Sequence, residues 1–156
     1  MRIALSCDHR GMSIRDALDA KLRAEGHLLV DVPACTGSSC DYPDMAWGVA
    51  RAVAEQRADR GILICGSGIG MSIAANKVRG IRAALVHDDI GAELSRRHND
   101  ANVLCLSADL LGLKLIERIV EIWLTTDFEG GRHARRVGKI GAIEEGRDPV
   151  GVSQQG

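Results

Sequence analysis

Chemically useful side chains gather around a glycine-rich segment, residues 66–70 (GSGIG), which directly follows Cys65. Backbone N–H groups of such a segment can approach an anion closely, and a helix over Met71–Lys77 would add its amino terminus. These N–H groups and the helix dipole would favour the thiolate form of Cys65. We therefore interpret Cys65 as a candidate base beside an anion cradle.

Other interpretations of this segment compete with an anion cradle. A dinucleotide fingerprint needs a third glycine where Met71 stands and should follow the first strand rather than the third. A phosphate loop of the Walker type needs Gly-Lys-Ser/Thr, which is missing. A tight strand-to-helix turn, with Cys65 as a small core residue, is the plain alternative.

Further candidates lie elsewhere in the chain. Asp8 and His9 follow the first apolar run, and His98 precedes Asn99, an amide that can donate to a developing oxyanion. Arg132 and Arg136 are four residues apart, so a helix would place them on one face as a phosphate clamp or as a solvated basic face. No His or Cys pair has HxxxH or CxxC spacing, so we expect no metal site.

These residues need strands and helices to position them. Five short apolar runs predict buried strands, and amphipathic stretches of helical length separate them. The runs are Ile3–Cys7, Leu28–Val32, Ile62–Cys65, Ile81–Val86 and Val103–Leu106. Such alternation predicts an α/β fold with a doubly wound parallel sheet, whose ligand site lies outside the carboxyl ends of the strands. Residues after the first and third strands should therefore open onto one crevice.

The helical stretches carry their own signals. Apolar residues from Ile14 to Leu22 recur at helical spacing and Gly26 should end that helix, whereas a second helix should start near Pro43. A helix from about Asp109 to Thr125 is apolar over most of its circumference, which predicts a homodimer. We expect one domain over residues 1–145 and a flexible tail over 146–156.

The composition restricts the classes of protein. The 156 residues carry 20 basic and 21 acidic side chains, so no basic excess indicates nucleic-acid binding. The five cysteines are odd in number and lack CxxC pairs, so we expect reduced thiols, with Cys35 and Cys40 in a loop without a partner. No signal-peptide core or membrane-spanning run is present, and we expect a cytoplasmic protein without membrane contacts.

Several motifs together resemble the family of ribose-5-phosphate isomerase B and galactose-6-phosphate isomerase, over about residues 2–145. The motifs are CDHRG at 7–11, DYP at 41–43, ICGSGIG at 64–70, ANK at 75–77, RRHNDAN at 96–102 and EGGRH at 129–133. The resemblance implies a Rossmann-like three-layer α/β/α sandwich with a five-stranded parallel sheet. It also implies a homodimer, with a tetramer open, in which each active site is built from both subunits.

The resemblance also implies roles for individual residues in a cofactor-free enediol proton shuttle on a phosphorylated sugar. Cys65 would move a proton between C2 and C1, Ser67 would assist at the neighbouring oxygen, and Asp8 and His98 would handle hydroxyls and open the ring. The remaining residues would bind substrate. They are Tyr42 in the pocket, Gly66, Gly68, Ile69, Gly70 and Asn99 at the enediolate oxygen, and His9, Arg132 and Arg136 at the phosphate.

One departure from the family pattern concerns the substrate. Many members carry an arginine that reaches phosphate where this chain has Asp109. We expect a ribose 5-phosphate isomerase, with other four- to six-carbon sugar phosphates as alternatives. A noncatalytic phosphate- or nucleotide-binding module is the competing class, and a redox role for the cysteines is a weaker third.

Overall fold

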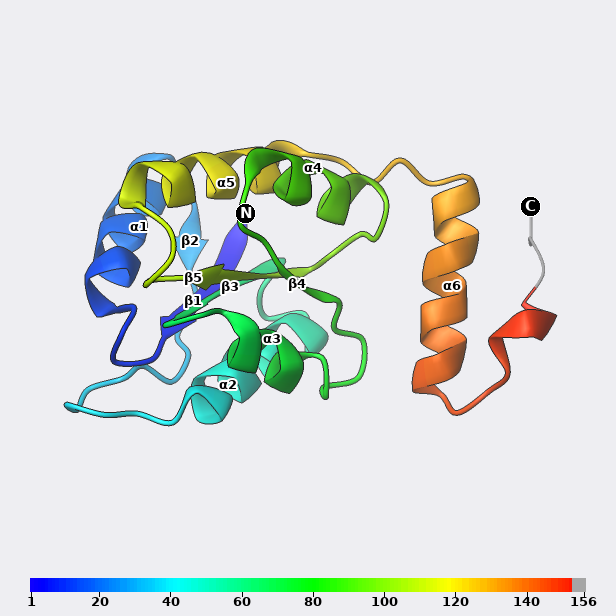
Figure 1. Ribbon diagram of the computed structural model, residues 1–156, viewed down its shortest axis with the longest axis horizontal. Coiled ribbons are helices and arrows are strands. Elements are labelled where there is room, and N and C mark those ends of the chain that lie inside the picture. Colours follow the sequence, from blue (N-terminus) through cyan, green and yellow to red (C-terminus); the bar gives the residue numbers. More distant parts are fainter. Residues whose placement is uncertain (153–156) are drawn as a thin grey trace.

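The computed structural model describes residues 1–152 and shows a parallel sheet between two helical layers (Figure 1). The strands are β1 (Arg2–Cys7), β2 (Leu28–Leu29), β3 (Arg60–Cys65), β4 (Ala83–Leu85) and β5 (Val103–Ser107). All pair in parallel, in the order β2-β1-β3-β5-β4. The predicted five-stranded Rossmann-like sandwich is confirmed.

Six α-helices and one 3-10 turn complete the described part of the chain. They are α1 (Met12–Ala24), α2 (Tyr42–Ala54), α3 (Ile69–Ala75), α4 (Asp89–Arg97), α5 (Leu113–Thr125), α6 (Arg132–Glu144) and the 3-10 turn η1 (Pro149–Gly151). Helices α1, α4 and α5 cover one face of the sheet, and α2 and α3 cover the other (Figure 1). Each face buries its own apolar cluster, one around Leu104 and Trp123 and one around Leu63 and Met71.

Two helix boundaries lie where the sequence predicted them. After α1 the chain turns at Gly26, whose positive φ of 82° suits glycine, and His27 N–H donates to Leu22 O in the hydrogen-bond pattern that closes many helices. Pro43 lies in the first turn of α2. Gly26 and Pro43 therefore mark a helix end and a helix start.

The predicted start of α5 near Asp109 is wrong, because the helix begins at Leu113. The residues before it are bonded to the base of the glycine loop instead. Asp109 N–H donates to Gly66 O at 3.0 Å, and Leu110 N–H donates to the buried Ser107 hydroxyl at 3.1 Å. These hydrogen bonds, in place of a first helical turn, hold Asp109 beside the loop.

Helix α5 is less exposed than the prediction of a homodimer from its apolar circumference required. Ile116, Ile119, Val120 and Trp123 are all buried in the chain's own core, Ile122 and Leu124 are partly buried against it, and among the large apolar residues of this helix only Leu113 and Leu115 are exposed. One chain thus accounts for most of the apolar circumference. Apolar side chains with a larger exposed fraction lie on other helices, among them Trp47, Ile69, Ile73, Ile140 and Ile143.

Two strands are shorter than the apolar runs that predicted them. β2 ends at Leu29 and β4 spans only Ala83–Leu85. Both are edge strands of the sheet, so only one neighbour holds each of them. Val30 N–H still donates to Ile3 O of β1 at 2.9 Å, and farther on Pro33 packs so closely on Gly48 of α2 that a Cβ there would lie 2.6 Å from it.

Helix α6 stands apart from the two layers, and η1 packs beside it (Figure 1). The predicted flexible tail over 146–156 is covered only to residue 152, and the remaining four residues lie outside the described part. Within that part Asp148 caps η1 by accepting a hydrogen bond from Val150 N–H at 2.8 Å. No helix of the described residues is long and apolar enough to cross a membrane.

Candidate active site

Cys65 and the glycine loop lie at the carboxyl end of β3, between the ends of β1 and β5. Cys65 is 4% exposed, and its Sγ accepts a hydrogen bond from Gly68 N–H at 3.1 Å. Gly68 has a φ of 76°, and a Cβ there would come within 2.5 Å of Leu85. Because position 68 has no side chain, the loop can adopt the conformation in which Gly68 N–H reaches the sulfur.

The residues that follow the first and third strands lie side by side, as the sequence predicted. Asp8 N–H donates to Ile64 O at 3.1 Å, which places the residue after β1 beside Cys65. Asp8 is 6% exposed, and its Oδ1 accepts from Arg10 N–H at 2.8 Å, so the carboxylate is oriented by its own turn. Ser67 is half-buried on the loop, and its Oγ accepts from Ile69 N–H at 3.3 Å.

Two further predicted residues lie at the same edge. The Tyr42 ring packs against Gly70, where a Cβ would come within 2.6 Å of it. His9 is exposed, and its Nδ1 accepts from Cys40 N–H at 3.4 Å, which leaves the proton of a neutral imidazole on Nε2. We call Asp8, His9, Tyr42, Cys65 and residues 66–70 the carboxyl-edge group.

The expectation that all five cysteines are reduced is wrong for two of them. Cys35 and Cys40 form a disulfide that closes the loop before α2. A spacing of five residues across Gly37-Ser38-Ser39 is compatible with such a bond, but the odd total and the missing CxxC concealed it. The bond matters for the site because Cys40 holds His9 and Tyr42 follows two residues later.

Cys7 and Cys105 are free thiols, as the sequence predicted. They are buried in β1 and β5. Burial raises the pKa of Cys7 to about 11 and also raises the pKa of Cys105. Both groups therefore stay protonated near neutral pH and serve as small core residues.

The other predicted residues lie at the opposite edge of the sheet. His98 caps the carboxyl end of α4, and the segment after it leads into the amino end of β5. Asn102 O accepts from Gly61 N–H at 2.9 Å, near the start of β3, whereas Cys65 ends that strand. Four residues of strand correspond to about 13 Å. Within the described part of one chain, His98 and Asn99 are therefore separated from Cys65.

Partly buried ionic contacts hold this second region together. Arg96 is 3% exposed and donates to Asp100 at 2.8 Å and to Ala101 O at 2.6 Å, while Arg82 donates to Asp100 from the other side at 2.9 Å. Asp100 has a positive φ of 46°. This network fixes the turn that presents His98 and the exposed Asn99.

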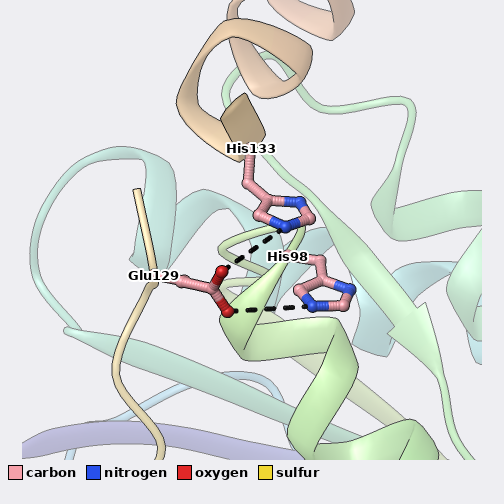
Figure 2. Close-up of side chains that lie close together, drawn as sticks. All are labelled: His98, Glu129 and His133. Atoms are coloured by element: carbon pink, nitrogen blue, oxygen red, sulfur yellow. Dashed lines mark ion pairs between the residues drawn. The ribbon is translucent and has the colours of Figure 1, made fainter. Parts of the chain in front are cut away.

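Figure 2 shows a cluster that the sequence reasoning missed, formed by His98, Glu129 and His133. The two imidazole rings stack at 4.0 Å between centroids, and each Nε2 lies within 4 Å of a different Glu129 oxygen. Arg97 donates to the same carboxylate at 2.8 Å. Burial, and next the charge of His98, lower the pKa of the nearly buried His133. The EGGRH motif carried the only sequence signal for this cluster.

Among the residues that the structure describes, these three side chains are the group whose ligand atoms lie close enough to hold a metal ion. One ligand atom from each lies within 4.8 Å of the others. The arrangement fits a metal poorly. The rings are parallel within 2°, so their in-plane lone pairs do not converge, and His133 Nε2 already accepts from Arg132 Nε at 3.2 Å. The expectation of no metal stays a prediction.

The arginine pair is placed as its spacing predicted. Arg132 and Arg136 both lie on α6, and both are exposed. Through His133 and Glu129, the start of α6 joins the end of α4, and Glu144 near its other end accepts from Gly80 N–H at 2.8 Å. We call His98, Asn99, Glu129, Arg132, His133 and Arg136 the amino-edge group.

Comparisons with known proteins show which family this chain belongs to. The ribose/galactose isomerase family matches residues 3–140. The chain belongs to this family. Ribose-5-phosphate isomerase B of Escherichia coli is 46% identical over 94% of this chain and 99% of its own length. A D-erythrulose-4-phosphate isomerase of Pectobacterium atrosepticum is 40% identical over 92% and 95%.

Solved structures agree with the sequence relatives. Ribose-5-phosphate isomerase B of Clostridium thermocellum has a TM-score of 0.91 and 48% identity, covering 94% of this chain and 99% of that one. The Mycoplasma genitalium enzyme with bound ribulose-5-phosphate has a TM-score of 0.88 and 41% identity, covering 92% and 96%. This protein is therefore a sugar-phosphate aldose–ketose isomerase, as the motifs predicted.

Proposed function

We propose that this isomerase interconverts ribose 5-phosphate and ribulose 5-phosphate through an enediolate, without metal or cofactor. The observation that carries the proposal is the Cys65 sulfur, held by Gly68 N–H at the carboxyl end of β3 beside Asp8. A thiolate there can accept a proton from a substrate held over the loop, with backbone donors facing the oxygen that becomes negative.

The proton transfer assigns one role to each residue near sulfur. Cys65 takes the proton from C2 of the open-chain aldose and returns it to C1, while the C2 hydroxyl becomes a carbonyl and the C1 oxygen becomes a hydroxyl. Ser67 moves protons at the neighbouring oxygen. Residues 66–70 stabilise the enediolate, and Tyr42 lines the pocket. Asn99, which one chain holds at the opposite edge of its sheet, joins the enediolate site from a second copy.

Ring opening and phosphate binding need both groups of residues. We propose that Asp8 and His98 handle the sugar hydroxyls and open the ring, and that His9, Arg132 and Arg136 bind the phosphate. Because one chain places the two groups at opposite edges of its sheet, a complete site needs a second copy. We therefore propose a homodimer with shared active sites. Pairing into tetramers, and the expected cytoplasmic location, stay predictions.

The relatives support more than one sugar length. A relative named for D-erythrulose 4-phosphate is nearly as similar to this chain as the ribose 5-phosphate enzymes are. Asp109 stands beside the loop where many family members carry an arginine. An isomerase for another four- to six-carbon sugar phosphate is therefore the second candidate.

The test is an isomerisation assay on a panel of four-, five- and six-carbon aldose phosphates with wild type and Cys65→Ala. We expect ribose 5-phosphate to give the highest kcat/KM, and we expect turnover to fall about 10²–10⁴-fold in the variant. Turnover retained in Cys65→Ala contradicts the assigned base. Tight binding of sugar phosphates with no exchange of the C2 proton into solvent supports a noncatalytic binding module instead.

A further inference from the structure

An ion pair spans the ends of β1 and β5 directly over the glycine loop. The Arg10 guanidinium donates to Asp109 Oδ1 through Nη2 at 2.7 Å and through Nε at 3.2 Å. Asp109 is bonded to the loop through its backbone, and its Oδ2 lies 2.8 Å from the point where a Cβ on Gly66 would stand. The carboxylate therefore faces the segment that we propose stabilises the enediolate.

This placement creates an electrostatic conflict. A phosphorylated sugar is an anion, and it gains a further negative oxygen when the enediolate forms. A carboxylate at the loop repels both charges, and repulsion between like charges at a binding site weakens binding considerably. Arg10 is the positive group in contact with Asp109, and the pair together carries no net charge.

We propose that Arg10 is a positioning residue that acts through Asp109: it cancels the charge of Asp109, so that the glycine loop can accept a phosphorylated substrate. The inference rests on the proposed function. It concerns contacts among three chain segments, since Arg10 precedes α1, Gly66 follows β3 and Asp109 follows β5.

Two other roles for Arg10 make different predictions. If its guanidinium bound the phosphate directly, removal of Asp109 would not compensate for the loss of Arg10. If Asp109 served only to orient Arg10 toward the phosphate, loss of Asp109 alone would weaken binding. Cancellation of charge predicts the reverse in both cases.

The experiment compares Arg10→Met, Asp109→Asn and the double variant with wild type. The readouts are the dissociation constant of inorganic phosphate, measured by titration calorimetry, and separate KM and kcat values for ribose 5-phosphate. We expect Arg10→Met to weaken phosphate binding and raise KM about tenfold. We expect Asp109→Asn to bind phosphate at least as tightly as wild type, and the double variant to return within about twofold of it.

A matched control uses the exposed pair Arg23–Asp19 on α1, with Nε–Oδ2 at 2.7 Å. The variants Arg23→Met and Asp19→Asn should leave phosphate binding unchanged. Failure of Asp109→Asn to rescue Arg10→Met overturns the inference, as does undetectable phosphate binding by wild type. If wild type isomerises no aldose phosphate, the proposed function fails, whereas the phosphate titration still tests the charge pair.

Discussion

The two groups of candidate residues differ in how they are built. In the carboxyl-edge group, backbone geometry places the chemistry: Gly68 N–H contacts Cys65 Sγ, and three strands end around the loop. In the amino-edge group, side-chain charges do so, since Glu129 lies beside His98 and accepts from Arg97, and the buried Arg96 anchors the turn after His98. Backbone donors need no reorganisation during reaction, whereas charged side chains can change protonation.

The difference suggests a division of work between the edges. The rigid edge suits proton transfer at carbon, for which the donors must already face the oxygen. The ionic edge suits ring opening and phosphate binding, for which an imidazole and guanidinium groups are useful. Four experiments test this comparison: the first asks whether the two groups are joined between two chains, and the other three ask how each group is held in place.

The largest expected effect comes from mixing two inactive variants. Cys65→Ala and His98→Asn chains should each lose about 10²–10⁴-fold in kcat. After unfolding and refolding together, half of the dimers are mixed, and each mixed dimer holds one intact site. We expect activity of about one quarter of wild type. Activity that stays at the level of the separate variants would contradict a site shared between chains.

The glycine loop should tolerate no side chain at position 68. Gly68→Ala combines a positive φ with a contact of 2.5 Å to Leu85 and should displace the N–H that faces Cys65. We expect a fall in kcat of about 10²-fold and a loss of unfolding free energy of ~1–3 kcal/mol. Gly80→Ala is the matched control, because Gly80 has a φ of 81° in open space. Equal kcat losses in both variants would contradict the contact argument.

The disulfide should matter moderately. Replacing Cys35 and Cys40 with serine releases a short loop, and chain entropy then predicts a loss of about 2 kcal/mol of unfolding free energy. We expect KM to rise about threefold with kcat unchanged, because the Cys40 N–H that orients His9 loses its fixed position. Urea unfolding and steady-state kinetics measure both effects. Identical results for wild type with and without reductant would show that the bond has no such role.

The smallest effect is a pH dependence of stability at the amino edge. The pKa of His133 is lower in the folded protein than in the unfolded chain, mainly through burial. The unfolded chain therefore binds more protons, and stability falls as pH drops from about 7 through the ordinary histidine value of about 6.5. Unfolding curves at pH 7.5, 6.5 and 5.5 should show this loss, and His133→Gln should reduce it. His87→Gln, at an exposed histidine, controls for the substitution itself.

The fold and the carboxyl-edge group could largely be predicted from the chain. Apolar runs identified all five strands, since burial on both faces of a parallel sheet demands nearly continuous apolar residues. The rule that ligand sites follow the carboxyl ends of strands then placed Asp8 beside Cys65 without any coordinates. The family motifs added the reaction.

What the sequence determined by itself is therefore the sheet, the glycine loop and the residue types available for chemistry, because each depends on local periodicity or on backbone freedom. Only the tertiary structure decided that Asp109 meets Arg10 over Gly66, that Cys35 bonds to Cys40, and that His98 stacks on His133. The first and last of these contacts depend on where separate chain segments end in space. The spacing of residues along the chain does not encode the distance between such segments.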